Sequence, residues 1–125
     1  MRENELADGI VDAAFHVHRF FGPGLLESAY EACLAHELLS MGFSVEKQVA
    51  LPLVYRDVKL DAGYRLDLWV ERTVIIEVKA VEELHPIHMA QMLTYLKLTG
   101  NKLGLIINFH SALLKNGMRR VVNNL

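Results

Sequence analysis

Hydrophobic and polar positions alternate along residues 64–80, YRLDLWVERTVIIEVKA, and this alternation predicts two β-strands joined by a short turn. The segment is rich in Val, Ile, Tyr, Trp and Thr, which favour strands. Successive side chains of a strand point to opposite faces, so one face is apolar and consists of Leu66, Leu68, Val70, Val74, Ile76 and Val78. The other face consists of Arg65, Asp67, Trp69, Ile75, Glu77 and Lys79. The two strands are therefore predicted to have one buried apolar face and one face that carries charged residues.

The length of the turn decides whether the charged side chains meet. A two-residue turn would place Asp67 and Glu77 on opposite faces of the sheet, whereas a three-residue turn at residues 71–73 would place them directly opposite each other. The same register would set Arg65 against Lys79. We expect the three-residue turn, because only this register aligns the apolar side chains of both strands on one continuous face.

Two opposed carboxylates have a chemical consequence. Side chains in such a pair have Cβ atoms roughly 4.5–5.5 Å apart, and like charges there are destabilising, so the pair needs a cation, a shared proton or a nearby ammonium. Lys79 can supply the ammonium. A hard divalent cation is the other candidate, since Mg²⁺ takes one or two carboxylates together with waters and phosphate oxygens. The alternative is a structural salt-bridge network of Arg65 and Lys79 with Asp67 and Glu77.

The remaining chain predicts helices and further strands around this pair. Apolar residues at helical spacing predict helices over residues 5–20 and 25–41, separated by the Gly22-Pro23-Gly24 turn. The other elements are a third helix from Pro86 to about Thr99 and five further strand segments. These are residues 43–49, a short hairpin of 51–55 and 58–60 turning at Arg56-Asp57, and residues 103–108 and 118–123. This order predicts one α/β domain over residues 1–125, a mixed sheet with helices on its faces.

Three helical residues are candidates for the same charged face. Glu27 lies on a helical stripe that is otherwise apolar, where a carboxylate must be paired, hydrogen-bonded or metal-bound. The alternative is a first-turn Glu favoured by the helix dipole. Gln91 and Tyr95 are four residues apart and share a helix face, from which they can offer hydrogen bonds toward the charged strands. The alternative is that Tyr95 is a half-buried core aromatic and Gln91 a surface residue.

Composition limits the protein class. The 125 residues are 52% hydrophobic, with one cysteine, Cys33, and without an apolar run long enough for a membrane span. We therefore expect a soluble, cytoplasmic protein that does not associate with membranes. The net charge of −2 argues against a strong general nucleic-acid binder. However, residues 101–125 contain four basic residues and no acid, so this edge either meets phosphates or is a solvated tail.

Several of these motifs resemble those of known nucleases. Asp67 followed by Glu77-Val78-Lys79 resembles the D…(D/E)xK signature of the PD-(D/E)XK nuclease superfamily, although Leu66 stands where a proline would precede the Asp. The Gln91-x-x-x-Tyr95 pattern is similar to the extra motif of the RecB-type and lambda-exonuclease-like branch. More specifically, residues 24–30, GLLESAY, resemble the signature of the small bacterial GxxExxY protein family. This similarity continues through the IEVKA, PIHMAQMLTYLK and LGLIINF stretches and covers nearly the whole chain.

The resemblance implies a restriction-endonuclease-like core with a Mg²⁺ or Mn²⁺ site on the central hairpin. It implies that Asp67 and Glu77 are metal ligands, helped by the backbone carbonyl of Val78, and that Glu27 is a further carboxylate at the site.

The resemblance also implies catalytic roles and a substrate. Lys79 would orient or deprotonate the attacking water, and Gln91 and Tyr95 would position Lys79 or the scissile phosphate. The implied function is a metal-dependent nuclease, with DNA favoured over RNA as the substrate. The alternative is a non-catalytic nuclease-fold module that binds nucleic acid or a protein partner. A homodimer is a further hypothesis, because a chain this small would need a partner to grip a duplex over any length.

Overall fold

The computed structural model describes residues 2–125, apart from the side chain of Ala62. Its elements, in chain order, are α1 (Arg2–Phe21), α2 (Glu27–Ser40), β1 (Val45–Tyr55), β2 (Val58–Val70), β3 (Val74–Lys79), α3 (Pro86–Thr99), β4 (Leu103–Asn108), the 3₁₀ turn η1 (Leu114–Gly117) and β5 (Met118–Val122). The five strands form one sheet in the order β1-β2-β3-β4-β5. Only the β3–β4 pair is parallel, so the sheet is mixed, as predicted. None of the described helices is long and apolar enough to cross a membrane.

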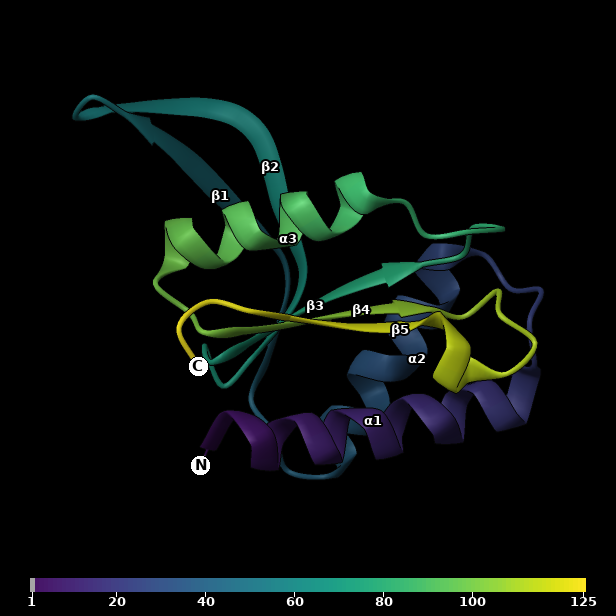
Figure 1. The fold of residues 1–125 in the computed structure, drawn as a ribbon. Coiled ribbons are helices and arrows are strands. Elements are labelled where there is room, and N and C mark those ends of the chain that lie inside the picture. The colour runs from purple at the N-terminus through teal and green to yellow at the C-terminus, as the bar shows by residue number, and fades with distance from the viewer. Residues whose placement is uncertain (1) are drawn as a thin grey trace.

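Helices cover both faces of the sheet (Figure 1). α1 and α2 pack on one face, where the core includes Leu68, Val70, Ile76 and Val78. α3 packs on the other face, where its buried side chains contact Ile75 and Ile106. The alternation of side chains along β3 thus divides the strand between the two cores.

Tyr30 fixes the connection between α1 and α2. Its hydroxyl accepts hydrogen bonds from the backbone N–H groups of Gly24, at 2.9 Å, and Leu25, at 3.1 Å, and donates to the carbonyl of Gly22. The Tyr30 ring is buried and stacks on Phe109 with the centroids 4.5 Å apart. Gly22 and Gly24 both have positive φ, which side-chain-bearing residues rarely adopt. The position of the first turn of α2 therefore depends on one buried hydroxyl.

β1 and β2 form a single long hairpin, which differs from the prediction of separate strand pairs. The turn lies at Arg56-Asp57 as expected, with both residues at positive φ. The break expected at Ala50, between the first strand and the short hairpin, is absent, and β1 has only a register shift between Leu51 and Leu53, at Pro52. Proline cannot donate to a ladder, but an edge strand tolerates it at such an irregularity. The outer part of the hairpin, residues 51–64, which we call the hairpin arm, extends away from the rest of the chain beyond α3 (Figure 1).

The predicted register of β2 and β3 is confirmed at the turn. Val70 pairs with Val74 and Leu68 pairs with Ile76, as the three-residue turn requires. The pairing ends there, so the expected pairing of Arg65 with Lys79 is wrong.

The face predicted for Leu66 is also wrong. Leu66 packs in the core on the α3 side, whereas Leu68 packs in the core on the α1–α2 side. The cause is the bend of β2 away from β3, which carries the strand toward the hairpin arm and changes the face that its side chains cover (Figure 1).

We predict that Tyr30→Phe lowers the free energy of unfolding by about 1–3 kcal/mol, because two backbone donors and one acceptor lose their partner inside the protein. The measurement is urea unfolding, with Tyr55→Phe on the exposed end of the hairpin arm as the matched control. Equal effects of the two substitutions would show that the hydroxyl of Tyr30 has no special role.

Candidate active site

The site lies in the gap that opens where β2 leaves β3. Two backbone N–H groups face this gap without a ladder partner, and side-chain carboxylates accept their hydrogen bonds. The N–H of Asp67 donates to Glu77 Oε2 at 2.9 Å, and the N–H of Val78 donates to Asp67 Oδ2 at 2.8 Å. Each strand thus contributes one carboxylate to the backbone of the other. The two carboxylates are therefore held close together, although the direct pairing of Asp67 with Glu77 that we expected is not part of the ladder, which ends at Leu68 and Ile76.

The environment of Glu77 disfavours its charge. Its side chain is only 7% exposed, and burial, followed by the negative charge of Asp67, raises the pKa of Glu77 to about 8. The hydrogen bond from the Asp67 backbone and the positive charge of Lys79 oppose this shift only in part. At neutral pH and without a cation, the pair therefore retains a proton, which is one way to relieve the repulsion of two opposed carboxylates.

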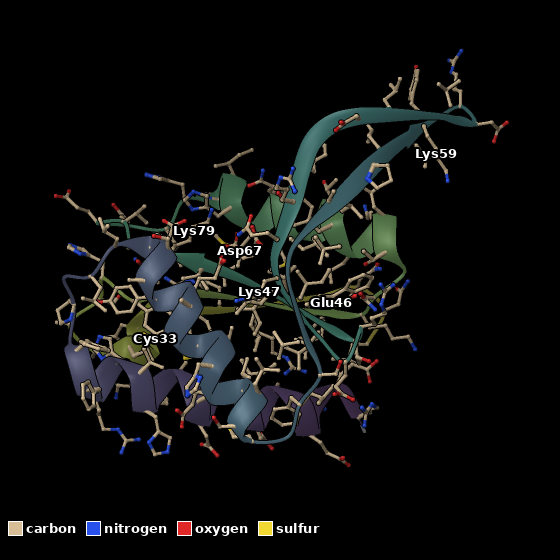
Figure 2. All side chains as sticks on the ribbon, turned by 180° about the vertical axis from the view of Figure 1, so that it is seen from behind. Cys33, Glu46, Lys47, Lys59, Asp67 and Lys79 are labelled. Atoms are coloured by element: carbon tan, nitrogen blue, oxygen red, sulfur yellow. The ribbon has the colours of Figure 1, made fainter. Side chains whose placement is uncertain are left out.

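Lys79 lies at the end of β3, close to this pair (Figure 2). Among residues 2–125 the ion pairs within 4.0 Å are Arg2–Glu71 and Arg72–Glu46, and neither involves the site. Arg65 instead donates a long hydrogen bond, 3.5 Å, to the carbonyl of Gln48. The structural salt-bridge network therefore does not form in the described part of the chain.

Glu27 is exposed and is not buried with the rest of its helical stripe, but its carboxylate is hydrogen-bonded, which is one of the three states that we expected. It is the first residue of α2, and its Oε2 accepts the N–H of Ala80 at 3.2 Å. A first-turn Glu favoured by the helix dipole matches this position. Glu27 and Asp67 line one hollow of about 570 Å³ together with Leu26, Ser28, Glu31 and Gln48. Within residues 2–125, however, no three His, Cys, Asp or Glu side chains are grouped so that they could hold a metal ion.

Two residues at the site, Gln48 and Glu31, were not predicted. Gln48 Nε2 donates to Glu31 Oε1 at 2.8 Å and to Asp67 Oδ1 at 3.3 Å. Burial is the main cause of a raised pKa for Glu31. The sequence did contain a signal for Glu31, because it is one helical turn after Glu27. It contained none for Gln48, whose position depends on the pairing of β1 with β2.

The structure separates the two α3 candidates. Tyr95 is buried, its ring meets Tyr64 edge-on with the centroids 5.9 Å apart, and burial followed by the negative charges of Glu77 and Asp67 raises the pKa of Tyr95 to about 12. Its hydroxyl therefore lies near the carboxylates and keeps its proton at neutral pH. Gln91 is exposed and lines a separate hollow with Tyr64. The burial of Tyr95 and the exposure of Gln91 agree with the alternative given above, in which Tyr95 is a core aromatic and Gln91 a surface residue.

The oxygen atoms in the gap fit a hard divalent cation. The N–H of Val78 faces Asp67, and the N–H and C=O of one strand residue point to the same side, so the Val78 carbonyl also faces the gap. Two carboxylates and a carbonyl are the donor types that Mg²⁺ and Mn²⁺ prefer. Because Mg²⁺ usually keeps several waters, two acids are sufficient.

We predict that Glu77→Gln stabilises the metal-free protein, and that the gain grows as the pH rises. The folded-state pKa of Glu77 lies above the ordinary value of 4.5, so stability falls between about pH 4.5 and pH 8, because the unfolded chain releases this proton there while the native protein retains it. Glutamine keeps an acceptor oxygen and avoids this loss. We expect a gain of about 1–3 kcal/mol at pH 8 and little at pH 4.5, measured by urea unfolding in EDTA. The exposed substitution Glu82→Gln is the control, and a loss of stability at pH 8 in Glu77→Gln would contradict the prediction.

Comparison with known proteins places the chain in a family. No curated protein and no solved structure matches it. The family model of the PD-(D/E)XK nuclease superfamily matches residues 4–121, which is nearly the whole chain. Three helices on a mixed sheet are also consistent with a restriction-endonuclease-like fold. The chain therefore belongs to the PD-(D/E)XK nuclease superfamily.

Proposed function

We propose that this protein is a metal-dependent nuclease that hydrolyses phosphodiester bonds, with DNA as the substrate and Mg²⁺ or Mn²⁺ as the cofactor. The observation that carries the proposal is the pair of Asp67 and Glu77, held together in the gap between β2 and β3 with Lys79 beside it. Membership in the superfamily, which typically uses a divalent metal, supports the same reaction.

Asp67, Glu77 and the carbonyl of Val78 would hold the cation, and Glu27 would contribute a further carboxylate from the start of α2. A divalent cation in such a site polarises a phosphoryl oxygen and lowers the pKa of bound water. Binding of a cation would also displace the proton that Glu77 retains at neutral pH.

The other side chains would act on the water and the phosphate. Lys79 would orient the attacking water and stabilise negative charge at phosphorus. Tyr95 keeps its proton at neutral pH, so it would act as a hydrogen-bond donor that positions Lys79 or the scissile phosphate. Gln91 lies at the surface of α3 in a separate hollow, and its proposed role is to contact the phosphate from there.

The GxxExxY motif has a structural basis that supports assignment to that family within the superfamily. Its tyrosine, Tyr30, ties down the turn after α1, and its glutamate, Glu27, binds the backbone directly after Lys79. We infer that the motif sets the start of α2 against the end of β3. The RecB-type branch is supported by the position of Tyr95 near the carboxylates.

The hairpin arm is the surface that we propose for contact with nucleic acid. Lys47 pairs with Leu68 beside the site, and Lys59 lies far out on the arm (Figure 2). Arg56 lies in the turn at the tip of the arm. The basic residues near the C-terminus are less available. Arg119 donates to two backbone carbonyls of its own turn, and Arg120 donates to Asn4 on α1.

A non-catalytic module that binds nucleic acid or a protein partner is the second candidate. The small number of acids grouped at the site and the net charge of −2 favour it. Calorimetric titration with Mn²⁺ distinguishes the two, because a module without a metal site would release no binding heat at physiological concentrations. A symmetric homodimer stays part of either proposal, since 125 residues cover only a short stretch of duplex.

We predict that the purified protein cleaves linear double-stranded or single-stranded DNA when Mg²⁺ or Mn²⁺ is present. Asp67→Asn, Glu77→Gln and Lys79→Met should each lower the rate by about 10²–10³-fold, the usual effect of removing one electrostatic group from a reaction centre. Lys97→Met, an exposed substitution on α3, is the matched control. Cleavage that survives the site substitutions would belong to a contaminant.

We predict that combining Arg56→Ala with Lys59→Ala weakens DNA binding without changing the affinity for Mn²⁺. Each lost phosphate contact should reduce the slope of log K against log salt by about 0.9 for duplex DNA. Lys115→Ala near the C-terminus is the control and should leave the slope unchanged. If Lys115→Ala has the larger effect, the nucleic acid contacts the opposite edge of the sheet.

A further inference from the structure

Gln48 has an unusual backbone conformation inside a strand. Its φ is 51°, a value that residues with a side chain rarely adopt outside turns. Among residues 2–125, the other non-glycine residues with positive φ lie in the two hairpin turns, at Arg56, Asp57, Glu71 and Arg72, or at Asn124 near the C-terminus. Such conformations persist where the surrounding structure imposes them, and they cluster at functional sites.

The unusual conformation occurs directly opposite Asp67. The β1–β2 pairing has Lys47 against Leu68 and Val49 against Leu66, and the pair between these two, Gln48 with Asp67, is missing from the ladder. The irregularity of β1 and the departure of β2 from β3 thus coincide at one residue, Asp67.

The conformation directs the Gln48 amide to two acids. Nε2 donates to Glu31 Oε1 at 2.8 Å and to Asp67 Oδ1 at 3.3 Å, and an amide has the two hydrogens that this requires. The second oxygen of Asp67, Oδ2, accepts the N–H of Val78. The Asp67 carboxylate is therefore held at both oxygens, by β1 on one side and β3 on the other.

Core packing does not explain this arrangement. The side chain of Gln48 is exposed and belongs to neither core cluster. Glycine or asparagine would adopt the positive φ more readily. The amide is also the group that suits the position chemically. A lysine or arginine would compete with a cation for Asp67, and a glutamate would repel both acids.

We propose that Gln48 is a positioning residue for Asp67, which it ties to α2 through Glu31 so that the Asp67 and Glu77 carboxylates bind one divalent cation. This inference rests on the proposed metal-dependent function. It assigns Gln48 and Glu31 a role in cation affinity even though neither needs to touch the cation.

The test is calorimetric titration of Mn²⁺ into the wild type and into Gln48→Gly and Gln48→Asn, at one pH, with the urea unfolding midpoint of each protein. Gln48→Gly removes the amide and suits the positive φ, so its midpoint should not fall, while the affinity for Mn²⁺ should fall about 10–100-fold, as for other residues that orient metal ligands. Gln48→Asn suits the same φ but is one methylene shorter, so it should also lose affinity. Asp57→Gly, at positive φ in the tip of the hairpin arm, is the matched control and should bind Mn²⁺ like the wild type.

The outcomes separate this inference from the proposed function. If the wild type binds Mn²⁺ and Gln48→Gly binds it equally well, the inference is wrong and the proposed function stands. If both Gln48 variants lose affinity together with a lowered unfolding midpoint, Gln48 has a general structural role and the inference is again wrong. If the wild type binds no Mn²⁺, the proposed function fails and the inference fails with it.

Discussion

The organisation of this protein depends on two backbone N–H groups that have no strand partner. Where β2 turns away from β3, the amides of Asp67 and Val78 would be unpaired in a largely buried place, which is costly. The carboxylates of Glu77 and Asp67 accept them, each across the gap. The need for backbone hydrogen bonds therefore brings two acids together despite their repulsion, and the proton that Glu77 retains at neutral pH relieves part of this repulsion without a cation.

The surrounding elements supply what this gap needs. On one side of the sheet, Tyr30 holds the start of α2 so that Glu27 reaches the backbone after β3 and Glu31 reaches Gln48. On the other side, α3 places the Tyr95 hydroxyl near the same acids. Side chains from both faces of the sheet therefore come together at the gap between β2 and β3.

The sequence predicted the mixed sheet with helices on its faces and the closeness of Asp67 and Glu77, because side-chain parity sets the pairing of β2 with β3. Only one turn length aligns the apolar residues of β2 and β3, and that turn brings Asp67 and Glu77 to the end of the ladder, where each carboxylate accepts a backbone N–H across the gap. Parity fails where a strand bends, and for this reason Leu66 packs on the unexpected face. The role of Gln48 was not predicted. It depends on a positive φ and on the pairing of β1 with β2, and the residues around Gln48 in the sequence indicate neither. We expected Glu27 on a buried stripe because helical spacing does not show which turns of a helix pack against the rest of the protein.

The hairpin arm creates a hazard that its own residues limit. β1 is one of the two edge strands of the sheet, and several apolar side chains on the arm are exposed, among them Val54, Tyr55, Val58 and Leu60. An exposed edge strand of this kind can pair with a strand of a neighbouring molecule, and repeated pairing leads to fibres. Pro52 interrupts the row of N–H donors, and the charged side chains of the arm, Arg56, Asp57, Lys59 and Asp61, each repel the same side chain of a second copy that approaches in the same orientation. The residues that suit the arm for a polyanion would thus also help to keep the protein from aggregating.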